Sequence, residues 1–117
     1  MQVEIEMFRN MEFYFNGKVT LVWAMLDICE KNGITIGEME GLTTLSTQPE
    51  GVQVGITVRE PKRGFYKISM RSTDSVNVAE ICQKLGGGGH VKAAGCTISG
   101  TTDEIRQTLL KAVESAI

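Results

Sequence analysis

Two stretches of alternating apolar and polar residues most constrain the fold of this 117-residue chain. Apolar side chains occupy every second position of residues 52–58, and the period returns over 66–71 after a turn at 61–64. This period is typical of strands with one buried face. The apolar faces match only if the connecting loop is odd in length, because a one-residue slip would set apolar against polar side chains. One such register places Gly55 opposite Arg71.

The polar face of this hairpin presents four hydrophilic side chains: Arg59, Lys67, Ser69 and Arg71. Further strands are indicated on either side of it. Asn16-Gly17 lies between two apolar runs and predicts a tight hairpin turn, followed by alternating apolar residues at 19–25. A short strand is predicted over Cys96–Ser99.

Three helices are indicated by capping patterns, in which a Thr or Asn stands three residues before a Glu. These pairs are Thr35 with Glu38, Asn77 with Glu80, and Thr101 with Glu104. The helix that follows Asn77 has apolar residues at 78, 81, 82 and 85, which form one face. The last helix has its predicted face at Ile105, Thr108, Leu109, Ala112, Val113 and Ala116. The sequence therefore predicts an α+β fold, a small mixed β-sheet with helices packed mainly on one face. Residues 1–16 are expected to be a connecting segment, the first ten of them a helix end or a linker.

Residues 86–90 read Gly-Gly-Gly-Gly-His, and the run continues as Val-Lys-Ala-Ala-Gly. Glycines are costly to order, so a folded chain is expected to use them. Gly86 is predicted to cap the preceding helix in the left-handed conformation. The rest of the run is predicted to bind an anion, most favourably phosphate, with positive φ and close ligand approach at Gly88. A structural turn and a flexible linker are the alternatives. Ala93 and Ala94 are predicted to lie in a short helix that starts near His90.

Charge is unevenly distributed along the chain. Residues 59–92 contain seven basic and three acidic residues, whereas the remainder contains five basic and eleven acidic ones. This asymmetry favours a localised anionic partner over general adhesion to nucleic acid, with an accidental cluster as the alternative. His90, the only histidine, lacks companions for a metal site and a nucleophile to activate. We therefore favour His90 as a hydrogen-bond donor to phosphate or to a base edge.

Cys29, Cys82 and Cys96 are odd in number and lack metal-site spacing. They are predicted to be reduced and mostly buried, as in a cytoplasmic protein. The chain has no apolar stretch of membrane-spanning length. Glu4 and Glu6 are not expected in a signal peptide.

Three segments together carry a resemblance to a known family. These are Ile68-Ser69-Met70-Arg71-Ser72, the stretch from Val76 to Ile81, and the glycine-histidine run from Gly86 to Gly95. They resemble the DHH-associated C-terminal domain of DHH-family phosphoesterases, most of all the RecJ-like group of bifunctional oligoribonucleases and phosphoadenosine-phosphate (pAp) phosphatases, often called nanoRNases. The resemblance covers residues 17–117.

The resemblance implies a division of labour between two domains. An N-terminal domain holds two manganese ions through aspartates and paired histidines and activates water, while the C-terminal domain holds the substrate. This sequence has no Asp-His-His motif. It is therefore expected to be the substrate-binding domain of a longer hydrolase, inactive by itself, with Mn²⁺ in the missing catalytic domain. The resemblance implies no catalytic or metal-binding residue here, and it assigns substrate and phosphate binding to Ser69, Arg71, Ser72, Gly87, Gly88, Gly89, His90 and Lys92.

Several alternatives stay open at this point. Cyclic-dinucleotide phosphodiesterases share a similar loop but tend to follow it with an Asn-Ala-Ala-like stretch, where this chain has Lys92-Ala93-Ala94. RecJ-type exonucleases, alanyl-tRNA synthetases and a stand-alone RNA- or nucleotide-binding module are the others. The expected partners are short RNA or DNA oligonucleotides, phosphorylated nucleotides and the chain's own catalytic domain, with no membrane. Substrate length and oligomeric state, including a homodimer, are left undetermined.

Overall fold

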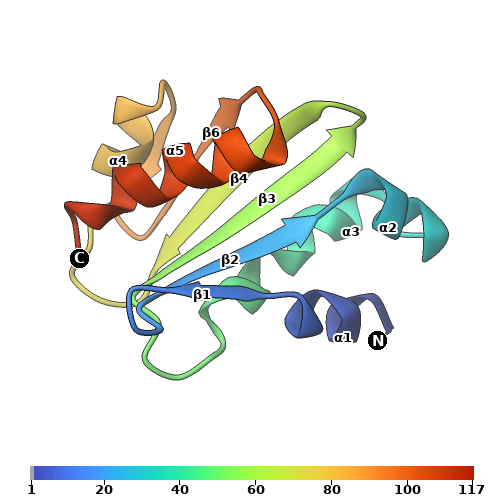
Figure 1. The fold of residues 1–117 in the computed structure, drawn as a ribbon, viewed down its shortest axis with the longest axis horizontal. Coiled ribbons are helices and arrows are strands. Elements are labelled where there is room, and N and C mark those ends of the chain that lie inside the picture. Colours follow the sequence, from blue (N-terminus) through green and yellow to red (C-terminus); the bar gives the residue numbers. More distant parts are fainter. Residues whose placement is uncertain (1) are drawn as a thin grey trace.

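The computed structural model describes residues 2–117 and contains a six-stranded mixed sheet with helices on both of its faces (Figure 1). The strands are β1 (Glu12–Tyr14), β2 (Val19–Ala24), β3 (Val54–Lys62), β4 (Phe65–Ser72), β5 (Gly88–His90) and β6 (Ala93–Ile98). The helices are α1 (Gln2–Arg9), α2 (Leu26–Lys31), α3 (Ile36–Gly41), the 3-10 helix η1 (Leu42–Thr47), α4 (Val78–Lys84) and α5 (Thr102–Glu114). The predicted α+β class is confirmed. Within residues 2–117, no helix is long and apolar enough to span a membrane.

The strand order is β1-β2-β3-β4-β6-β5, and of the five pairings between these strands only that of β2 with β3 is parallel. The predicted pair of Gly55 with Arg71 is confirmed. The β3–β4 hairpin extends further toward its turn than the alternation indicated, with an irregularity between Arg59 and Lys62. The Asn16-Gly17 turn is also confirmed, because β1 and β2 pair antiparallel on either side of it.

Buried apolar side chains form two clusters, one on each face of the sheet. The first lies under α4 and α5 and includes the alternating residues of the predicted hairpin, among them Val54, Ile56, Ile68 and Met70. The second lies under the N-terminal helices and comprises Met7, Met11, Val22, Ala24, Cys29, Met39, Leu42 and Leu45. Strand β2 contributes to both clusters, so it is buried on both faces.

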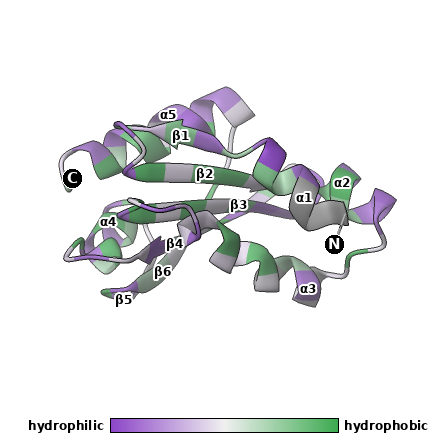
Figure 2. Ribbon diagram, turned by 90° about the horizontal axis from the view of Figure 1, so that it is seen from below, coloured by the Kyte–Doolittle hydropathy of each residue, from purple (hydrophilic) through white to green (hydrophobic). Residues whose placement is uncertain are grey.

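The second cluster depends on a helical layer beyond the three predicted helices. Helix α1 occupies residues predicted as a connecting segment, and α2 begins directly after Met25, so the predicted strand ends at Ala24. The N-terminal helices contact β2 and β3, and η1 also reaches β4. Strands β5 and β6 lie at one side of the sheet, away from the layer of N-terminal helices (Figure 2). A strip of sheet surface beside η1 is therefore left accessible.

The three predicted helix starts are confirmed by their hydrogen bonds. The side-chain oxygens of Thr35, Asn77 and Thr101 accept from the backbone N–H three residues later, at 3.1, 3.2 and 3.1 Å. In α5 the buried residues are Ile105, Leu109 and Val113, which belong to the predicted apolar face. Thr108 and Ala116 of that face are exposed.

The short helix predicted near His90 is wrong. Residues 88–90 and Ala93 and Ala94 instead lie in strands β5 and β6, which pair with each other and continue the sheet from β4. The strand predicted over Cys96–Ser99 is part of β6, which ends at Ile98. Helix propensity of the two alanines is overridden because pairing along all six residues of β6 satisfies their backbone groups and buries Cys96 in the core.

A partly buried ion pair joins the first strand to the last helix. The Glu12 carboxylate accepts from Arg106 Nε at 2.8 Å and Nη2 at 2.9 Å, and it also accepts from Trp23 Nε1 at 3.1 Å. The Arg106 guanidinium lies 5.0 Å from the Trp23 ring centroid. Bidentate, charge-assisted hydrogen bonding of this kind is stronger than a neutral hydrogen bond. The Arg106 hydrogen bond accordingly lowers the pKa of Glu12.

We expect Glu12→Gln to lower the free energy of unfolding by about 1–2 kcal/mol at neutral pH, the scale of a hydrogen bond to a charged group. The native pKa of Glu12 lies below its ordinary value of 4.5, so this stabilisation is present above about pH 4.5 and is lost as the pH falls through the native pKa. Urea unfolding of both proteins from pH 7 to pH 3 should show the difference shrinking with acid. Glu114→Gln, an exposed acid on α5, is the control. An unchanging difference would contradict the assignment.

Candidate functional site

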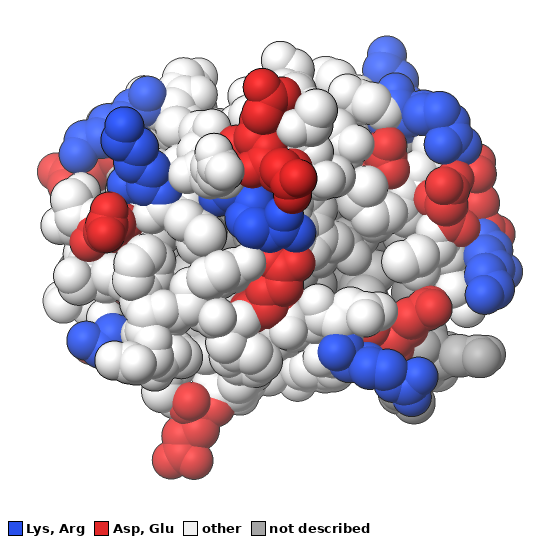
Figure 3. Space-filling view, viewed as in Figure 1, with Lys and Arg blue, Asp and Glu red and all other residues white. Residues whose placement is uncertain are grey.

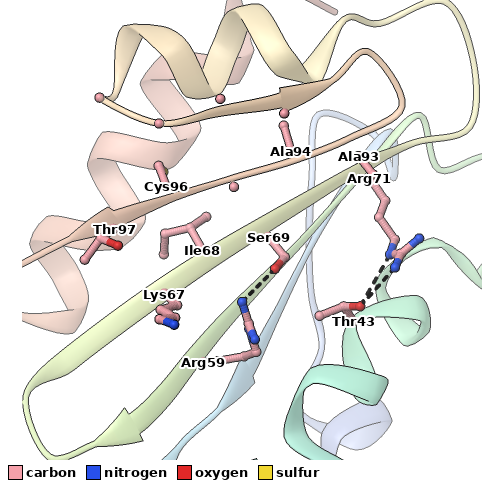
Figure 4. Close-up of a pocket in the computed structure, with 15 residues that line it drawn as sticks. Thr43, Arg59, Lys67, Ile68, Ser69, Arg71, Ala93, Ala94, Cys96 and Thr97 are labelled. Carbon is pink, nitrogen blue, oxygen red and sulfur yellow. Dashed lines mark hydrogen bonds between the residues drawn. The ribbon is translucent and has the colours of Figure 1, made fainter. Parts of the chain in front are cut away.

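A pocket of about 660 Å³ opens on the sheet surface beside η1 (Figure 4). Its lining includes the cations Arg59, Lys67 and Arg71, and no Asp or Glu is among the residues that line it. The volume is in the range of small-ligand sites, and a lining with cationic side chains and no acidic side chain attracts anions. All three cations come from the basic segment 59–92 identified in the sequence.

Strand pairing arranges the floor of this pocket in rows. The rows across β4, β6 and β5 are Arg71 with Ala93 and His90, Ser69 with Gly95 and Gly88, and Lys67 with Thr97. Residues directly opposite each other on paired strands project their side chains to the same face. Cationic side chains therefore stand at both ends of the floor, and a hydroxyl and two glycines lie between them.

Arg71 reaches the pocket beside Thr43 of η1. Its Nε and Nη2 donate to Thr43 Oγ1 at 3.4 and 3.3 Å (Figure 4). Helix η1 can approach this closely because Gly55, the partner of Arg71 on β3, has no side chain. A Cβ there would lie 2.4 Å from Ser46 Oγ and 2.7 Å from the Ser46 carbonyl carbon. The predicted register thus determines the position of Arg71 and also allows η1, which carries Thr43, to pack beside it.

Arg59 is oriented at the other end of the floor by a second hydroxyl. Its Nη2 donates to Ser69 Oγ at 3.1 Å. The Thr43 hydroxyl orients the Arg71 guanidinium without neutralising it, whereas Arg63 and Arg106 are paired with carboxylates outside the pocket. On the molecular face drawn in Figure 3, basic and acidic side chains form small mixed groups with no continuous basic patch.

The first two glycines of the run end helix α4. Gly86 has φ +89°, its N–H donates to the Gln83 carbonyl at 3.1 Å, and the Gly87 N–H donates to the Cys82 carbonyl at 2.8 Å. This pair of hydrogen bonds is the Schellman motif. The predicted role of Gly86 is confirmed. The Gly87 N–H is also occupied by the cap, so it is not available to an anion.

Gly88 and Gly89 begin strand β5, and Gly87 and Gly89 allow close backbone packing. A Cβ on Gly87 would lie 2.1 Å from the Gly95 carbonyl oxygen, and one on Gly89 would lie 2.6 Å from Ala94 Cα. Gly88 differs, because a Cβ there would meet no atom within 4 Å. The positive φ expected at Gly88 is wrong, since Gly86 and Gly89 carry it instead. Gly88 thus has open space at the pocket for a side chain and, unlike Gly86, does not have a positive φ.

The structure brings together most of the predicted site residues. Five of them line the pocket: Ser69, Arg71, Gly87, Gly88 and Gly89. His90 is exposed at the end of β5, in the same row as Arg71 but outside the lining. Ser72 and Lys92 also lie outside it, and their side chains both donate to the Asp74 carbonyl, that of Ser72 at 3.1 Å. Ligand binding by these eight residues stays a prediction.

Sequence reasoning missed several residues of the pocket. Arg59 and Lys67 were placed on the polar face without a role, and Thr43 was not singled out at all. Thr43 is 28 residues from Arg71 and meets it only through the packing of η1 on the sheet. The signal that could have found this contact is Gly55, a glycine inside an alternating strand, which marks a close approach by another segment.

All three cysteines are reduced and buried, as predicted. A hydrogen bond with Cys96 and burial both raise the pKa of the Cys82 thiol, so Cys82 is protonated at neutral pH. No group of three or more His, Cys, Asp or Glu able to hold a metal ion occurs among the described residues. The pocket therefore offers charge and hydrogen-bond donors rather than metal ligands.

Comparison with known protein families shows to which family this chain belongs. Residues 17–117 match the DHHA1 domain family, which is most of the chain and the span predicted from the resemblance. This chain is a DHHA1 domain. The predicted DHH-associated identity is confirmed, and the pocket lies entirely within the matched residues.

The DHHA1 domain has relatives among phosphoesterases of the DHH family. It is 41% identical over 69 residues to the bifunctional oligoribonuclease and PAP phosphatase NrnA of Thermus thermophilus, a match covering 58% of this chain and 21% of that protein. It is 37% identical over 89 residues to the cyclic-di-AMP phosphodiesterase PdeA of Listeria monocytogenes, covering 74% of this chain and 13% of that protein. The chain thus spans a minor part of each relative's length.

Solved structures share the fold of the DHHA1 domain. An exopolyphosphatase-related protein from Bacteroides fragilis superposes with a TM-score of 0.87 at 23% identity, over 97% of this chain and 34% of that one. The pGpG-specific phosphodiesterase PggH from Vibrio cholerae superposes with a TM-score of 0.67 at 16% identity, over 99% and 39%. At these identities the likeness supports the fold alone.

The glycines of the run are expected to respond differently to substitution. Gly87→Ala should lower the free energy of unfolding by about 1–3 kcal/mol, because its methyl group would overlap the backbone of β6. Gly88→Ala should change it by no more than about 1 kcal/mol, and alanine there reduces the entropy of the unfolded chain. Thermal unfolding of both variants measures the difference. Equal losses of unfolding free energy in the two variants would contradict the close packing of Gly87 against β6.

Proposed function

We propose that this DHHA1 domain binds the phosphate and terminal nucleotide of a short oligoribonucleotide or of pAp, and presents it to the catalytic domain of a phosphoesterase. The observation that carries the proposal is the pocket, in which Arg71 is oriented by the Thr43 hydroxyl and no lining residue is acidic. A phosphate would supply the missing negative charge through charge-assisted hydrogen bonds. The relationship to NrnA and PdeA, whose names describe phosphoester hydrolysis, supports this substrate class.

In this proposal Arg71 holds the phosphate. Its hydrogen bonds to Thr43 use Nε and Nη2, and within residues 2–117 no partner is seen for Nη1. A planar guanidinium can bind two phosphate oxygens at once, which a lysine cannot do with the same geometry. His90 stands in the same row of the sheet and adds a second donor from the β5 edge.

The glycine run has a spatial role in the proposed complex. Gly88 and Gly95 lie side by side in the middle row, next to Ser69, and they leave space for a sugar or a base above the sheet. Ser72 and Lys92 hold the carbonyl of Asp74 near the end of β4. We therefore propose that Ser72 and Lys92 support Arg71 and do not contact the phosphate themselves.

We propose that residues outside this chain carry out the hydrolytic step. The described residues include no cluster suited to a metal ion, so no metal-dependent step is derived for them. We propose that Mn²⁺ is bound by a separate catalytic domain of the same protein. The small share of NrnA and PdeA that this chain spans supports such an arrangement. The free, buried cysteines support a cytoplasmic location.

A second candidate substrate is a cyclic dinucleotide, which the similarity to PdeA over 74% of the chain favours. The same pocket would bind it through the same phosphate chemistry. Titration with a linear 5′-phosphorylated dinucleotide and with cyclic di-AMP distinguishes the two substrates. Tighter binding of the cyclic compound would favour that alternative.

We expect Arg71→Ala to weaken binding of adenosine 5′-monophosphate by about 5- to 150-fold, the effect of losing a charge-assisted hydrogen bond worth about 1–3 kcal/mol. His90→Ala should act in the same direction. Isothermal titration gives the affinities, and amide shifts should cluster at residues 69–72 and 86–95. Lys62→Ala removes an exposed cation of the same sheet that does not line the pocket, so it is the control. Wild-type affinity in Arg71→Ala would refute the site.

The 117-residue chain is also expected to hydrolyse neither short oligoribonucleotides nor pAp when Mn²⁺ is added. The reason is that its described residues lack a metal cluster that could activate water. Product analysis by chromatography with purified chain tests this. Manganese-dependent turnover that persists through repeated purification would contradict the proposal that a separate domain carries out hydrolysis.

A further inference from the structure

Two cysteine side chains meet in the core between α4 and β6, directly behind the pocket. Cys82 of α4 and Cys96 of β6 belong to the same apolar cluster, and α4 packs against β6. Their thiols form a hydrogen bond with each other. The proposed function uses neither thiol. We infer that Cys82 and Cys96 are a reversible redox pair, which a peroxide entering the pocket oxidises to a disulfide.

The backbone at Gly87 brings the two cysteines together. The Gly87 N–H donates to the Cys82 carbonyl at 2.8 Å. A Cβ added to Gly87 would lie 2.7 Å from Cys96 Cβ. The end of α4 therefore approaches β6 with only a glycine between them. A disulfide requires its two Cβ atoms to lie about 3.5–4.5 Å apart, and thiols that already hydrogen-bond reach such a geometry by moving side chains rather than a whole helix.

The two thiols differ in access and in reactivity. Cys96 is 8% exposed and lines the pocket, whereas Cys82 is fully buried. A small oxidant in the pocket therefore meets Cys96 first. The Cys82 thiol donates its hydrogen bond to the Cys96 sulfur, and this bond lowers the pKa of Cys96. Because the thiolate is the nucleophilic form, Cys96 is the attacking thiol and Cys82 is the resolving one.

The oxidation takes place in two steps. The Cys96 thiolate attacks one oxygen of hydrogen peroxide, the O–O bond breaks, and hydroxide leaves, so that Cys96 becomes a sulfenic acid. The Cys82 sulfur then attacks the sulfenic sulfur, its proton passes to the departing hydroxyl group, and water leaves. Together the two thiols lose two electrons and two protons, and the peroxide is reduced to two waters. Exchange with a small thiol reverses the reaction.

The disulfide would change the part of the chain that forms one wall of the pocket. Cys82 and Cys96 stand on either side of the glycine run, so their bond closes residues 82–96 into a covalent loop. Gly86–Gly89 and Ala93–Gly95 within this loop line the pocket. A cross-link removes conformational freedom from open states of the loop that it closes. Amide hydrogen exchange at residues 86–92 should therefore slow by about tenfold or more on oxidation.

The test treats the folded 117-residue chain with hydrogen peroxide and maps its cysteines by mass spectrometry without reduction. Trypsin places Cys82 in peptide 72–84 and Cys96 in peptide 93–106. We expect these two peptides to be joined, with the loss of two hydrogen atoms, and to separate when dithiothreitol is added. Circular dichroism recorded during the reaction shows that the chain stays folded.

Cys29 is the internal control. It is as fully buried as Cys82, but it lies in the cluster on the opposite face of the sheet, away from the other two cysteines. Its thiol should react at least about tenfold more slowly than that of Cys96. Cys29→Ala should still form the disulfide, whereas Cys82→Ala should stop with Cys96 as a sulfenic or sulfinic acid. The mapping of the wild-type chain decides the question even if Cys82→Ala does not fold.

Three results would overturn the inference. These are oxidation of Cys29 as fast as that of Cys96, disulfides that join only separate chains, and a disulfide between Cys82 and Cys96 that forms only after unfolding in urea. Unchanged hydrogen exchange at residues 86–92 in the oxidised chain would refute the effect on the pocket wall. A reversible disulfide between peptides 72–84 and 93–106 in the folded chain supports the inference, whatever the affinity of the pocket for nucleotides.

Discussion

The antiparallel register between β3 and β4 is the constraint on which the rest of the structure depends. With Gly55 opposite Arg71, the apolar side chains of both strands face the cluster under α4 and α5. The same register turns Arg59, Lys67, Ser69 and Arg71 to the other face. A slip of one residue would bury these side chains and expose the apolar ones, so the hydrophobic effect that stabilises the core also fixes the position of the cations.

Glycines then determine how closely other elements approach this hairpin. At Gly55 the missing side chain admits η1, and at Gly95 it admits the backbone of β4. The run that begins at Gly86 ends a helix, turns, and becomes an edge strand within five residues. Each of these glycines except Gly88 is explained by packing or by backbone conformation. The run therefore shapes the pocket by allowing close contact between backbone segments.

The charge of the pocket depends on the hydrogen-bond partners of its arginines. Arg106 and Arg63 are matched with carboxylates, and such pairs contribute to stability or to surface charge balance. Arg71 is matched with Thr43, whose hydroxyl orients it and leaves its charge intact, and Arg59 donates to the Ser69 hydroxyl. A positive site held in place before binding loses less side-chain entropy when an anion arrives. Arg71 therefore differs in its partners from Arg63 and Arg106, which are paired with carboxylates.

The sequence by itself determined the elements with strong local signals. The period of two fixed the hairpin and its register, three capping patterns located the starts of α3, α4 and α5, and Gly86 was identified as a helix cap. These features depend on neighbours in the chain, so they can be read from it. Only the tertiary structure decided that Ala93 and Ala94 lie in a strand instead of a short helix, that η1 brings Thr43 to Arg71, and that His90 lies outside the pocket. Those outcomes depend on contacts between segments far apart in sequence, where pairing and packing free energies exceed local propensity.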